Sequence, residues 1–357
     1  MAYTTINKPS LHFKTLLYTG NSSANHAITG VGFAPDLVWQ KRRDSTNDHV
    51  WFDTSRGATK FLQSAGSAAE KTSAANQDTQ SLDSDGFTVG TPTQAGGINA
   101  GSCVAWNWKA NGGTTSSNTS GSVTTTVQAN TTAGFSIVTY TGDGNAATFG
   151  HGLGAVPSAI IIKQRNTTRN WYTKSNAMGS GYNLQLDTQN NRFNSASYNA
   201  GIIDDLDNAT TFNITKSGST DPTNVNGSGG SYIAWCFAEK KGFSKFGSYT
   251  GNGNADGTFV YTGFKPGLII IKNLTENDDW LMYDTKREGY NVDNDALRPS
   301  LTNAEATDDD LDILSNGFKL RRNIGTINNS SRDYIYFAWA EEPLVANVGT
   351  GVPATAR

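Results

Sequence analysis

Short apolar runs bounded by turn residues recur along the chain and predict β-strands. Three of these runs follow a proline and are rich in β-branched or other apolar residues, at positions 36–40, 158–162 and 267–271. A run of four or five such residues between turn residues favours a buried strand over a helix. A polar loop and a strand that carries a tryptophan follow each run, so each pair of strands is predicted to form a hairpin.

The same landmarks recur three times in the same order, which makes the chain a tandem array of units of about 100 residues. Each unit has a Tyr-Thr-Gly turn, a proline fifteen residues after the glycine, a lysine six residues after the proline, a tryptophan and a closing Ala-Trp pair. The closing runs are continuously apolar, so we expect them at the centre of a sheet. The landmark residues are Tyr18, Tyr140 and Tyr249; Pro35, Pro157 and Pro266; Lys41, Lys163 and Lys272; Trp51, Trp171 and Trp280; and Trp106, Trp235 and Trp339.

Composition changes along the chain predict where the units begin and end. Residues 111–133 are mostly Gly, Ser, Thr and Asn, which predicts a linker with room for an edge strand. The second and third repeats join without a linker, so we expect them to be fixed against each other while the first moves more freely. The predicted segments are an N-terminal arm (1–10), β-sandwich repeats (11–110, 134–241 and 242–342), the linker (111–133) and a C-terminal tail (343–357).

Composition narrows the fold class and the partners. Charged residues make up only 17% of the chain and there are 38 glycines, which is typical of an all-β protein with many turns. The formal net charge of −3 favours neither nucleic acid nor an anionic membrane as a partner. No apolar run approaches the roughly 18 residues of a membrane-spanning helix, and no signal peptide is evident at the start. We therefore expect a protein made in a cytoplasm and not inserted in a membrane.

The repeated landmarks have structural and functional interpretations. Trp51, Trp171 and Trp280 are candidates for stacking on a sugar, although the hairpin also suits the core. The closing tryptophans are expected in the core. The three landmark lysines stand where a buried strand emerges, so we expect solvated charges at the ends of these strands. Two short basic patches, 41–43 and 321–322, are expected to be exposed or to pair with acidic loops of a neighbouring subunit.

Residue types that carry chemistry do not recur with the repeat, and we predict no catalytic residue and no cofactor. The four histidines lie beside no nucleophile motif and have no metal-type spacing. Acidic clusters at 204–205, 278–279 and 308–312 are expected to be solvated loop charges. Cys103 and Cys236 occupy different places in their repeats and are expected to be reduced, half-buried thiols.

One loop of the third repeat imitates the first half of a calcium-binding loop. Its candidate ligands are Asn252, Asn254 and Asp256, but the glutamate that should close such a loop is replaced by Gly263. The loop is better explained as a tight glycine turn, so the sequence predicts no metal.

Longer stretches around the landmarks resemble one known protein family. They lie at 17–20, 28–39, 52–60, 84–87, 134–142, 151–154, 242–251, 335–343 and 354–357. Together they resemble a family of phage virion proteins, common in marine phages and cyanophages and often described only as structural or tail-fibre-like. The resemblance covers essentially the whole chain. It implies membership of a virion and carries over no catalytic residue.

The residues and the resemblance together predict three tandem β-sandwich domains, jelly-roll or lectin-like, in a bacteriophage structural protein on the exterior of the virion. The leading hypothesis is a tail fibre or adhesin-type appendage that contacts the host surface. A capsid decoration or head-fibre protein is the alternative, and a polysaccharide depolymerase is a third. The expected partners are other phage structural proteins, further copies of the chain in a homo-oligomer with a trimer favoured, and a glycan of the host surface. The sequence favours no enzyme.

Overall fold

The secondary structure is almost entirely antiparallel β-strand, which confirms the all-β prediction. The computed structural model describes residues 4–194, 201–216, 222–287, 291, 294–308 and 310–342. The predicted C-terminal tail, residues 343–357, lies outside the described residues. Two short 3₁₀ helices occur between the strands, η1 (Pro9–Leu11) and η2 (Asn176–Met178).

Each repeat builds a main sheet on the same plan. The first strand of the repeat pairs with the last, the last pairs with the strand after the proline, and that strand pairs with the next one along the chain. The closing strands therefore lie inside their sheets, as their continuous apolar runs predict. In sheet order, the strands are β1 (Phe13–Asn21), β9 (Ala100–Trp108), β3 (Leu37–Arg42), β4 (Val50–Asp53), β5 (Lys60–Gln63) and β6 (Lys71–Thr72) in the first repeat; β10 (Ser116–Asn118), β11 (Thr125–Asn130), β12 (Phe135–Thr141), β19 (Ser231–Phe237), β14 (Ala159–Gln164), β15 (Trp171–Ser175), β16 (Tyr182–Gln185) and β17 (Phe193–Asn194) in the second; and β20 (Ser244–Thr250), β28 (Asp333–Ala340), β22 (Pro266–Asn273) and β23 (Trp280–Asp284) in the third.

A smaller sheet covers one face of each main sheet and completes a sandwich. The apolar side chains between the two layers form a separate core in each repeat. The strands of the smaller sheets are β2 (His26–Thr29), β8 (Gly86–Val89) and β7 (Thr79–Asp83); β13 (Ala147–Gly150) and β18 (Thr211–Ile214); and β21 (Phe259–Tyr261), β27 (Gly317–Leu320) and β26 (Leu311–Leu314), with a further pair β24 (Asn294–Ala296) and β25 (Ala306–Asp308) in the third repeat.

The predicted linker is part of the second main sheet. Strand β11 pairs with β12 over five residues, from Thr126 opposite Thr139 to Asn130 opposite Phe135. Strand β10 then pairs with β11 at the edge of the sheet. Residues 111–133 therefore supply two strands to the second repeat.

The opposite faces of the three main sheets pack against one another. A fourth apolar cluster contains side chains from all three repeats. The Trp51 ring lies 5.3 Å from the Trp171 ring and 4.8 Å from the Trp235 ring, while the Trp108 ring lies 5.4 Å from Trp339. We call this cluster the shared core. Because the first repeat contributes to it as fully as the others, the expectation that this repeat moves more freely is wrong.

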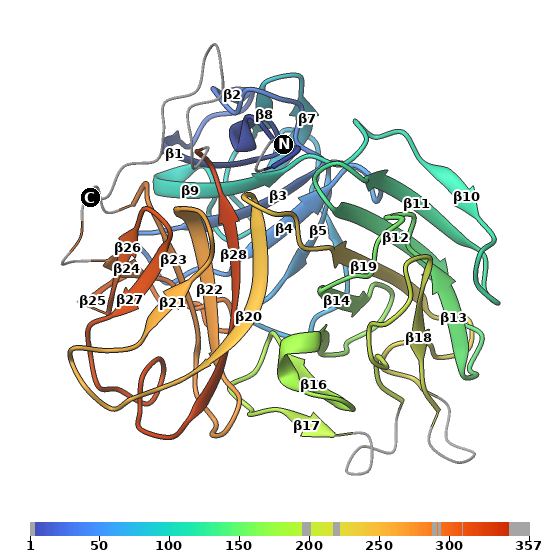
Figure 1. The fold of residues 1–357 in the computed structure, drawn as a ribbon. Helices are drawn as coiled ribbons and strands as arrows, with labels where there is room; N and C mark the ends of the chain where they lie inside the picture. Colours follow the sequence, from blue (N-terminus) through green and yellow to red (C-terminus); the bar gives the residue numbers. More distant parts are fainter. Residues whose placement is uncertain are drawn as a thin grey trace.

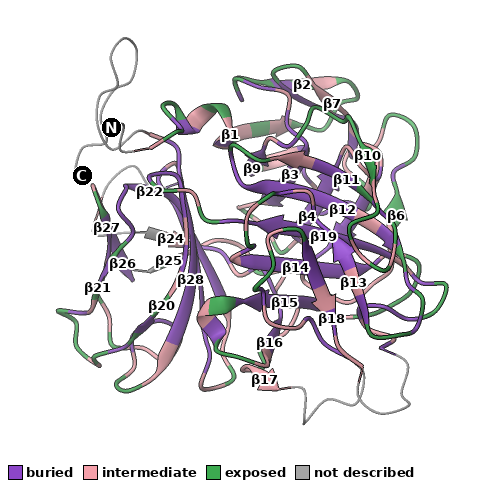
Figure 2. Cartoon of the chain, turned by 45° about the vertical axis from the view of Figure 1, so that its right-hand side comes forward, coloured by how far each residue is buried: buried purple, intermediate pink, exposed green. Residues whose placement is uncertain are grey.

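The repeats lie around a common centre (Figure 1), with the first in blue, the second in green and the third in orange and red. We call this arrangement the ring. The strands that face its centre are buried, whereas exposed residues gather in the outer loops (Figure 2). Both faces of a main sheet are covered, one by the smaller sheet and one by the other repeats, which explains the unbroken apolar runs.

One landmark tryptophan is not equivalent to the other two. Trp171 pairs with Lys163 and Trp280 pairs with Lys272 across their hairpins. In the first repeat Gln40 pairs with Val50. Continuing this register by one residue places His49 opposite Lys41. Trp51 lies two residues further along, opposite Trp39. The predicted equivalence of Trp51 with Trp171 and Trp280 is therefore wrong by two residues.

The closing tryptophan of the third repeat is offset in the same way. Trp106 pairs with Trp39 and Trp235 pairs with Ile161, both four residues after the landmark proline. The third repeat places Phe337 opposite the corresponding residue, Ile270. Side chains of a strand alternate between faces, so a shift of two residues keeps each tryptophan on the face of the shared core.

Candidate functional site

The tryptophans considered for sugar stacking, Trp51, Trp171 and Trp280, are at most 1% exposed. Side chains so deeply buried cannot stack on a ligand, which corrects that interpretation. Two of their indole nitrogens bind the preceding repeat instead. Trp171 Nε1 donates to Gln63 O and Gly66 O of the first repeat, and Trp280 Nε1 donates to Gln185 O of the second, over 3.0 to 3.1 Å.

The landmark lysines are fully buried and join neighbouring repeats, so the expectation of solvated charges is wrong. Each ammonium donates to a backbone carbonyl of its own repeat and to one of another repeat. The bonds between repeats run from Lys41 to Thr302 (3.3 Å), from Lys163 to Ser67 (3.2 Å) and from Lys272 to Gln189 (2.9 Å). The first repeat thus binds the third, the second binds the first and the third binds the second, which closes the ring.

Burial lowers the pKa of each landmark lysine to about 8. The cause is the loss of hydration of the charged form, and nearby carboxylates only partly oppose it. At neutral pH the ammonium groups remain protonated, and carbonyl oxygens take the place of their water.

Ion pairs add to two of the three junctions. Arg43 Nη2 lies 2.5 Å from Glu305 Oε1 of the third repeat, and Arg165 Nε lies 2.8 Å from Glu70 Oε2 of the first. Lys41 and Arg43 of the basic patch thus contact another repeat of the same chain, whereas Arg42 pairs with Asp44 of its own repeat. Arg321 and Arg322 pair within the third repeat, with Asp312 and Asp310.

Part of the acidic clusters is less exposed than predicted. Asp310 is 1% and Asp312 is 5% exposed, which corrects the expectation of solvated charges for these two residues. Asp205 accepts a bond of 2.6 Å from Lys174 Nζ. Both cysteines are free and buried, and burial raises the pKa of the Cys103 thiol to about 11.

The histidines serve local structure. His49 is fully buried, and its Nδ1 accepts a bond of 3.0 Å from Trp39 Nε1. Burial lowers its pKa well below the usual value near 6.5. Within the described part of the chain, no histidine is hydrogen-bonded to a serine or cysteine side chain; His12, His26 and His151 contact Asn130, Asn99 and the Asn208 carbonyl.

The calcium-like loop is held by its own turns. Asn254 N donates to Asn252 Oδ1 and Asp256 N donates to Asn254 Oδ1, each over 3.0 Å. Lys319 Nζ lies 2.5 Å from Asp256 Oδ1, where a cation would have to compete with it. Among the described residues no group of three or more His, Cys, Asp or Glu side chains is placed to hold a metal ion.

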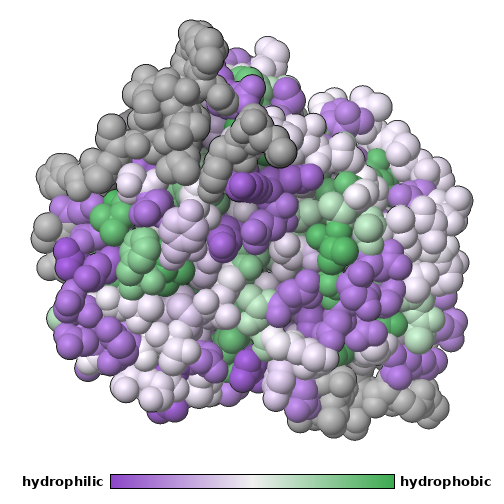
Figure 3. Space-filling model, viewed as in Figure 1, coloured by the Kyte–Doolittle hydropathy of each residue, from purple (hydrophilic) through white to green (hydrophobic). Residues whose placement is uncertain are grey.

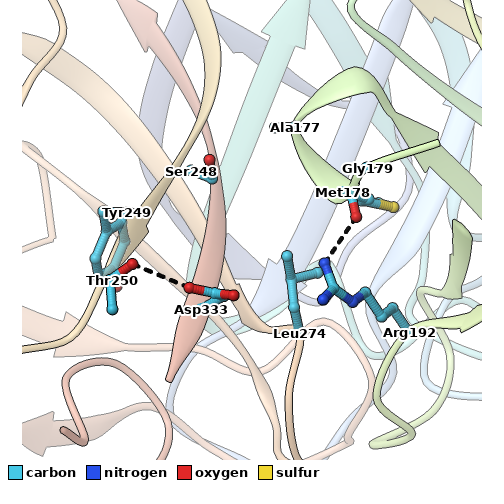
Figure 4. Close-up of a pocket in the computed structure, with 9 residues that line it drawn as sticks. All are labelled: Ala177, Met178, Gly179, Arg192, Ser248, Tyr249, Thr250, Leu274 and Asp333. Carbon is cyan, nitrogen blue, oxygen red and sulfur yellow. Dashed lines mark hydrogen bonds between the residues drawn. The ribbon is translucent and has the colours of Figure 1, made fainter. Parts of the chain in front are cut away.

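A groove of about 350 Å³ lies at the junction of the second and third repeats (Figure 4). One wall is helix η2 with Ala177 and Met178. The other wall is the edge strand β20 with Ser248 and Thr250, and Leu274 lies between the two walls.

Two oppositely charged side chains enter this groove from opposite walls (Figure 4). Arg192 Nη1 donates to Met178 O over 2.8 Å, and its guanidinium stacks 4.5 Å from the Tyr182 ring centre. Asp333 Oδ1 accepts from Thr250 Oγ1 over 3.0 Å. Within the described ranges neither charge forms a salt bridge. The contacts fix the orientation of both groups and leave both charges available to a ligand.

Sequence reasoning missed this groove, although the repeat offered a signal. Asp333 pairs with Thr250, and the equivalent pairs in the other repeats join Ser102 to Thr19 and Ser231 to Thr141. A charged residue therefore replaces a serine only in the third repeat. Arg192 lies in a stretch of variable length, where alignment of the repeats has no landmark.

The sequence profile of one protein family, described as a domain of unknown function (DUF7483), matches residues 8–343. The chain belongs to this family. The match runs through all three repeats as one unit, in agreement with the shared core. No curated protein and no solved structure matches the chain.

The surface seen in Figure 3 is mainly polar, with small separate hydrophobic areas. Among the large hydrophobic side chains of the described residues, Tyr261 and Phe259 on β21 are the most exposed, at 55% and 45%. No helix in the described ranges has the length and hydropathy needed to cross a membrane.

Proposed function

We propose that this family member is a structural protein on the exterior of a bacteriophage particle, of the tail-fibre or adhesin type. The observation that carries the proposal is the closure of three repeats into one ring by buried lysines. A ring closed by contacts between all its repeats suits a part that transmits force and presents loops at a fixed geometry. The stretches that resemble phage virion proteins supply the remaining support.

In this proposal the variable loops contact a glycan of the host surface. Other structural proteins of the particle hold the chain in place, and further copies of the chain, as a trimer, complete the appendage. The protein would be assembled in the cytoplasm of the host bacterium.

A second candidate is a capsid decoration or head-fibre protein. The observation that favours it is the arrangement of three similar sandwiches around one centre, because such a module matches a threefold position of a capsid lattice. The two candidates differ in where the protein lies on the particle.

Gold-labelled antibodies against the purified chain, imaged on intact particles, test both candidates. Label at the tail tip supports an appendage, label over the head lattice supports decoration, and unlabelled particles contradict both. Release of reducing ends from host capsule by the purified chain would support a depolymerase instead.

A further inference from the structure

The turn that forms one wall of the groove has an equivalent at each of the other two junctions. Each junction brings the edge of one main sheet against the turn that follows the hairpin of another repeat. The register makes Ala177 equivalent to Ser55 in the first repeat and to Lys286 in the third, because each lies two residues after the hairpin partner of the same β-strand position.

A long polar side chain contacts the equivalent turn at each of the other two junctions. Gln128, from β11, donates from Nε2 to Thr54 Oγ1 and Ser55 Oγ over 2.8 and 2.9 Å, and its Oε1 accepts from Gly113 N over 2.8 Å. The third repeat supplies Glu341 to the first. Its Oε1 accepts from Thr15 N over 2.6 Å, and its Oε2 lies 3.4 Å from Lys286 Nζ.

The second repeat's equivalents of five groove residues line a smaller opening of about 220 Å³ at the junction of the first and second repeats. They are Thr139, Tyr140, Thr141, Arg165 and Ser231, and Arg165 is already paired there with Glu70. At the junction of the second and third repeats the turn offers the single methyl group of Ala177, and the groove has the larger volume of about 350 Å³. That volume falls within the ~300–1,000 Å³ typical of small-molecule sites.

The charges of the groove indicate which polar molecule fits. We propose that the groove binds one sugar unit that carries a carboxylate, of the uronic acid class. Arg192 would bind the carboxylate through its guanidinium, the group best suited to bidentate pairing. Asp333 and Ser248 would bind ring hydroxyls, and Leu274 would contact the apolar face of the sugar. This contact rests on the proposed attachment to a host glycan and names its chemical class.

Two probes that differ only at C6 test the proposal on the full chain. Methyl β-glucuronide carries a carboxylate there, and methyl β-glucoside carries a hydroxymethyl group. Ligand-observed NMR titrations should show about tenfold tighter binding of the glucuronide, the factor expected for a hydrogen bond to a charged group. Arg192→Gln should reduce glucuronide affinity to that of the glucoside. Equal affinities for the two probes in the wild type would overturn the proposal.

A matched pair of variants locates the site. Ser248→Gln places a long amide in the groove and should abolish binding. Leu17→Gln makes the corresponding change on β1, where Leu17 directly precedes Tyr18 as Ser248 precedes Tyr249 on β20, and should bind as the wild type does. Thermal melting checks that both variants fold.

Different results would contradict the proposed ligand of the groove and the proposed virion function. Unchanged glucuronide binding by Ser248→Gln, or no binding of either probe by the wild type, overturns the groove. Gold labelling of particles decides the virion role whatever the titrations show.

Discussion

Lys163 of the second repeat donates a hydrogen bond of 3.2 Å from Nζ to the backbone carbonyl of Ser67 in the first repeat. The same lysine donates to Gln164 O over 2.8 Å. With its equivalents Lys41 and Lys272, it places a charge at each junction of the ring, so the ring rests on groups that can be tested one at a time.

Replacement of Lys163 should destabilise the protein. Lys163→Met keeps an apolar stem but leaves Ser67 O and Gln164 O without their donor, at a cost of about 1–3 kcal/mol in the free energy of unfolding. Denaturant unfolding followed by tryptophan fluorescence measures the loss. Lys8→Met, at an exposed position, is the control and should change little. Equal stability of the two variants would contradict the role of Lys163 at the junction.

The buried lysines should make stability rise with pH above 8. Lys272 has a pKa of about 8 in the folded protein and near 10.5 when unfolded. Between these values the unfolded chain keeps a proton that the folded chain has lost, so the free energy of unfolding increases with pH in that window. Below pH 8 this lysine is protonated in both states and does not change the stability with pH. The stability of the wild type relative to Lys272→Met should therefore grow by about 2–3 kcal/mol from pH 8 to 10.5.

Buried tyrosines and thiols titrate in the same range with the opposite sign. The pKa of Tyr334 is raised to about 12 and that of Cys103 to about 11 by burial. Both groups are present in wild type and variant alike, so their contributions cancel in the difference. A difference that stays constant from pH 8 to 10.5 would show that Lys272 does not titrate as its burial implies.

His49 should make the protein sensitive to acid. Its folded pKa lies well below 6.5, so as pH falls through 6.5 the unfolded chain takes up a proton that the folded chain refuses. Stability should then fall by up to ~1.4 kcal/mol per pH unit from this group. His49→Asn retains an acceptor for Trp39 Nε1 but does not titrate. Melting temperatures at pH 7 and pH 5 should drop less in this variant, and an equal drop would exclude His49 as the cause.

The first repeat should not fold alone. A fragment of residues 1–133 would expose side chains of the shared core, including Trp39, Trp51 and Trp106. Exposed apolar area of this size opposes a compact monomer. We expect strong binding of a hydrophobic dye and no cooperative thermal transition, in contrast to the full chain. A monodisperse fragment that melts cooperatively would show that the sandwich core alone is sufficient.

The local pattern was enough to predict where strands form and which of them lie inside a sheet. The run at 158–162 overlaps β14 from Ala159 onward, the run at 267–271 falls within β22, and the closing runs form the inner strands β19 and β28. Apolar residues between turn residues determine a strand wherever the chain lies. The same pattern was insufficient for the lysines, because an isolated Lys at the end of a strand looks solvated until another repeat covers it.

The groove, like the burial of the lysines, could not be predicted from the local sequence pattern. Its walls come from η2 and β20, which are far apart in the chain, and the side chains that contact the equivalent turns come from β11 and from Glu341. No spacing in the sequence relates these segments. The repeat gave the one signal, because Asp333 stands where the other two repeats have a serine.

The sequence by itself determined that the protein is all-β and built from three repeats, because turn residues and strand periodicity act over a few neighbouring residues. The tertiary structure decided what covers each sheet and which tryptophans are equivalent. An apolar strand face is compatible with any apolar partner, and a shift of two residues, as between Trp51 and His49, leaves the same face inward. The closed ring therefore depends on contacts between repeats that no single repeat encodes.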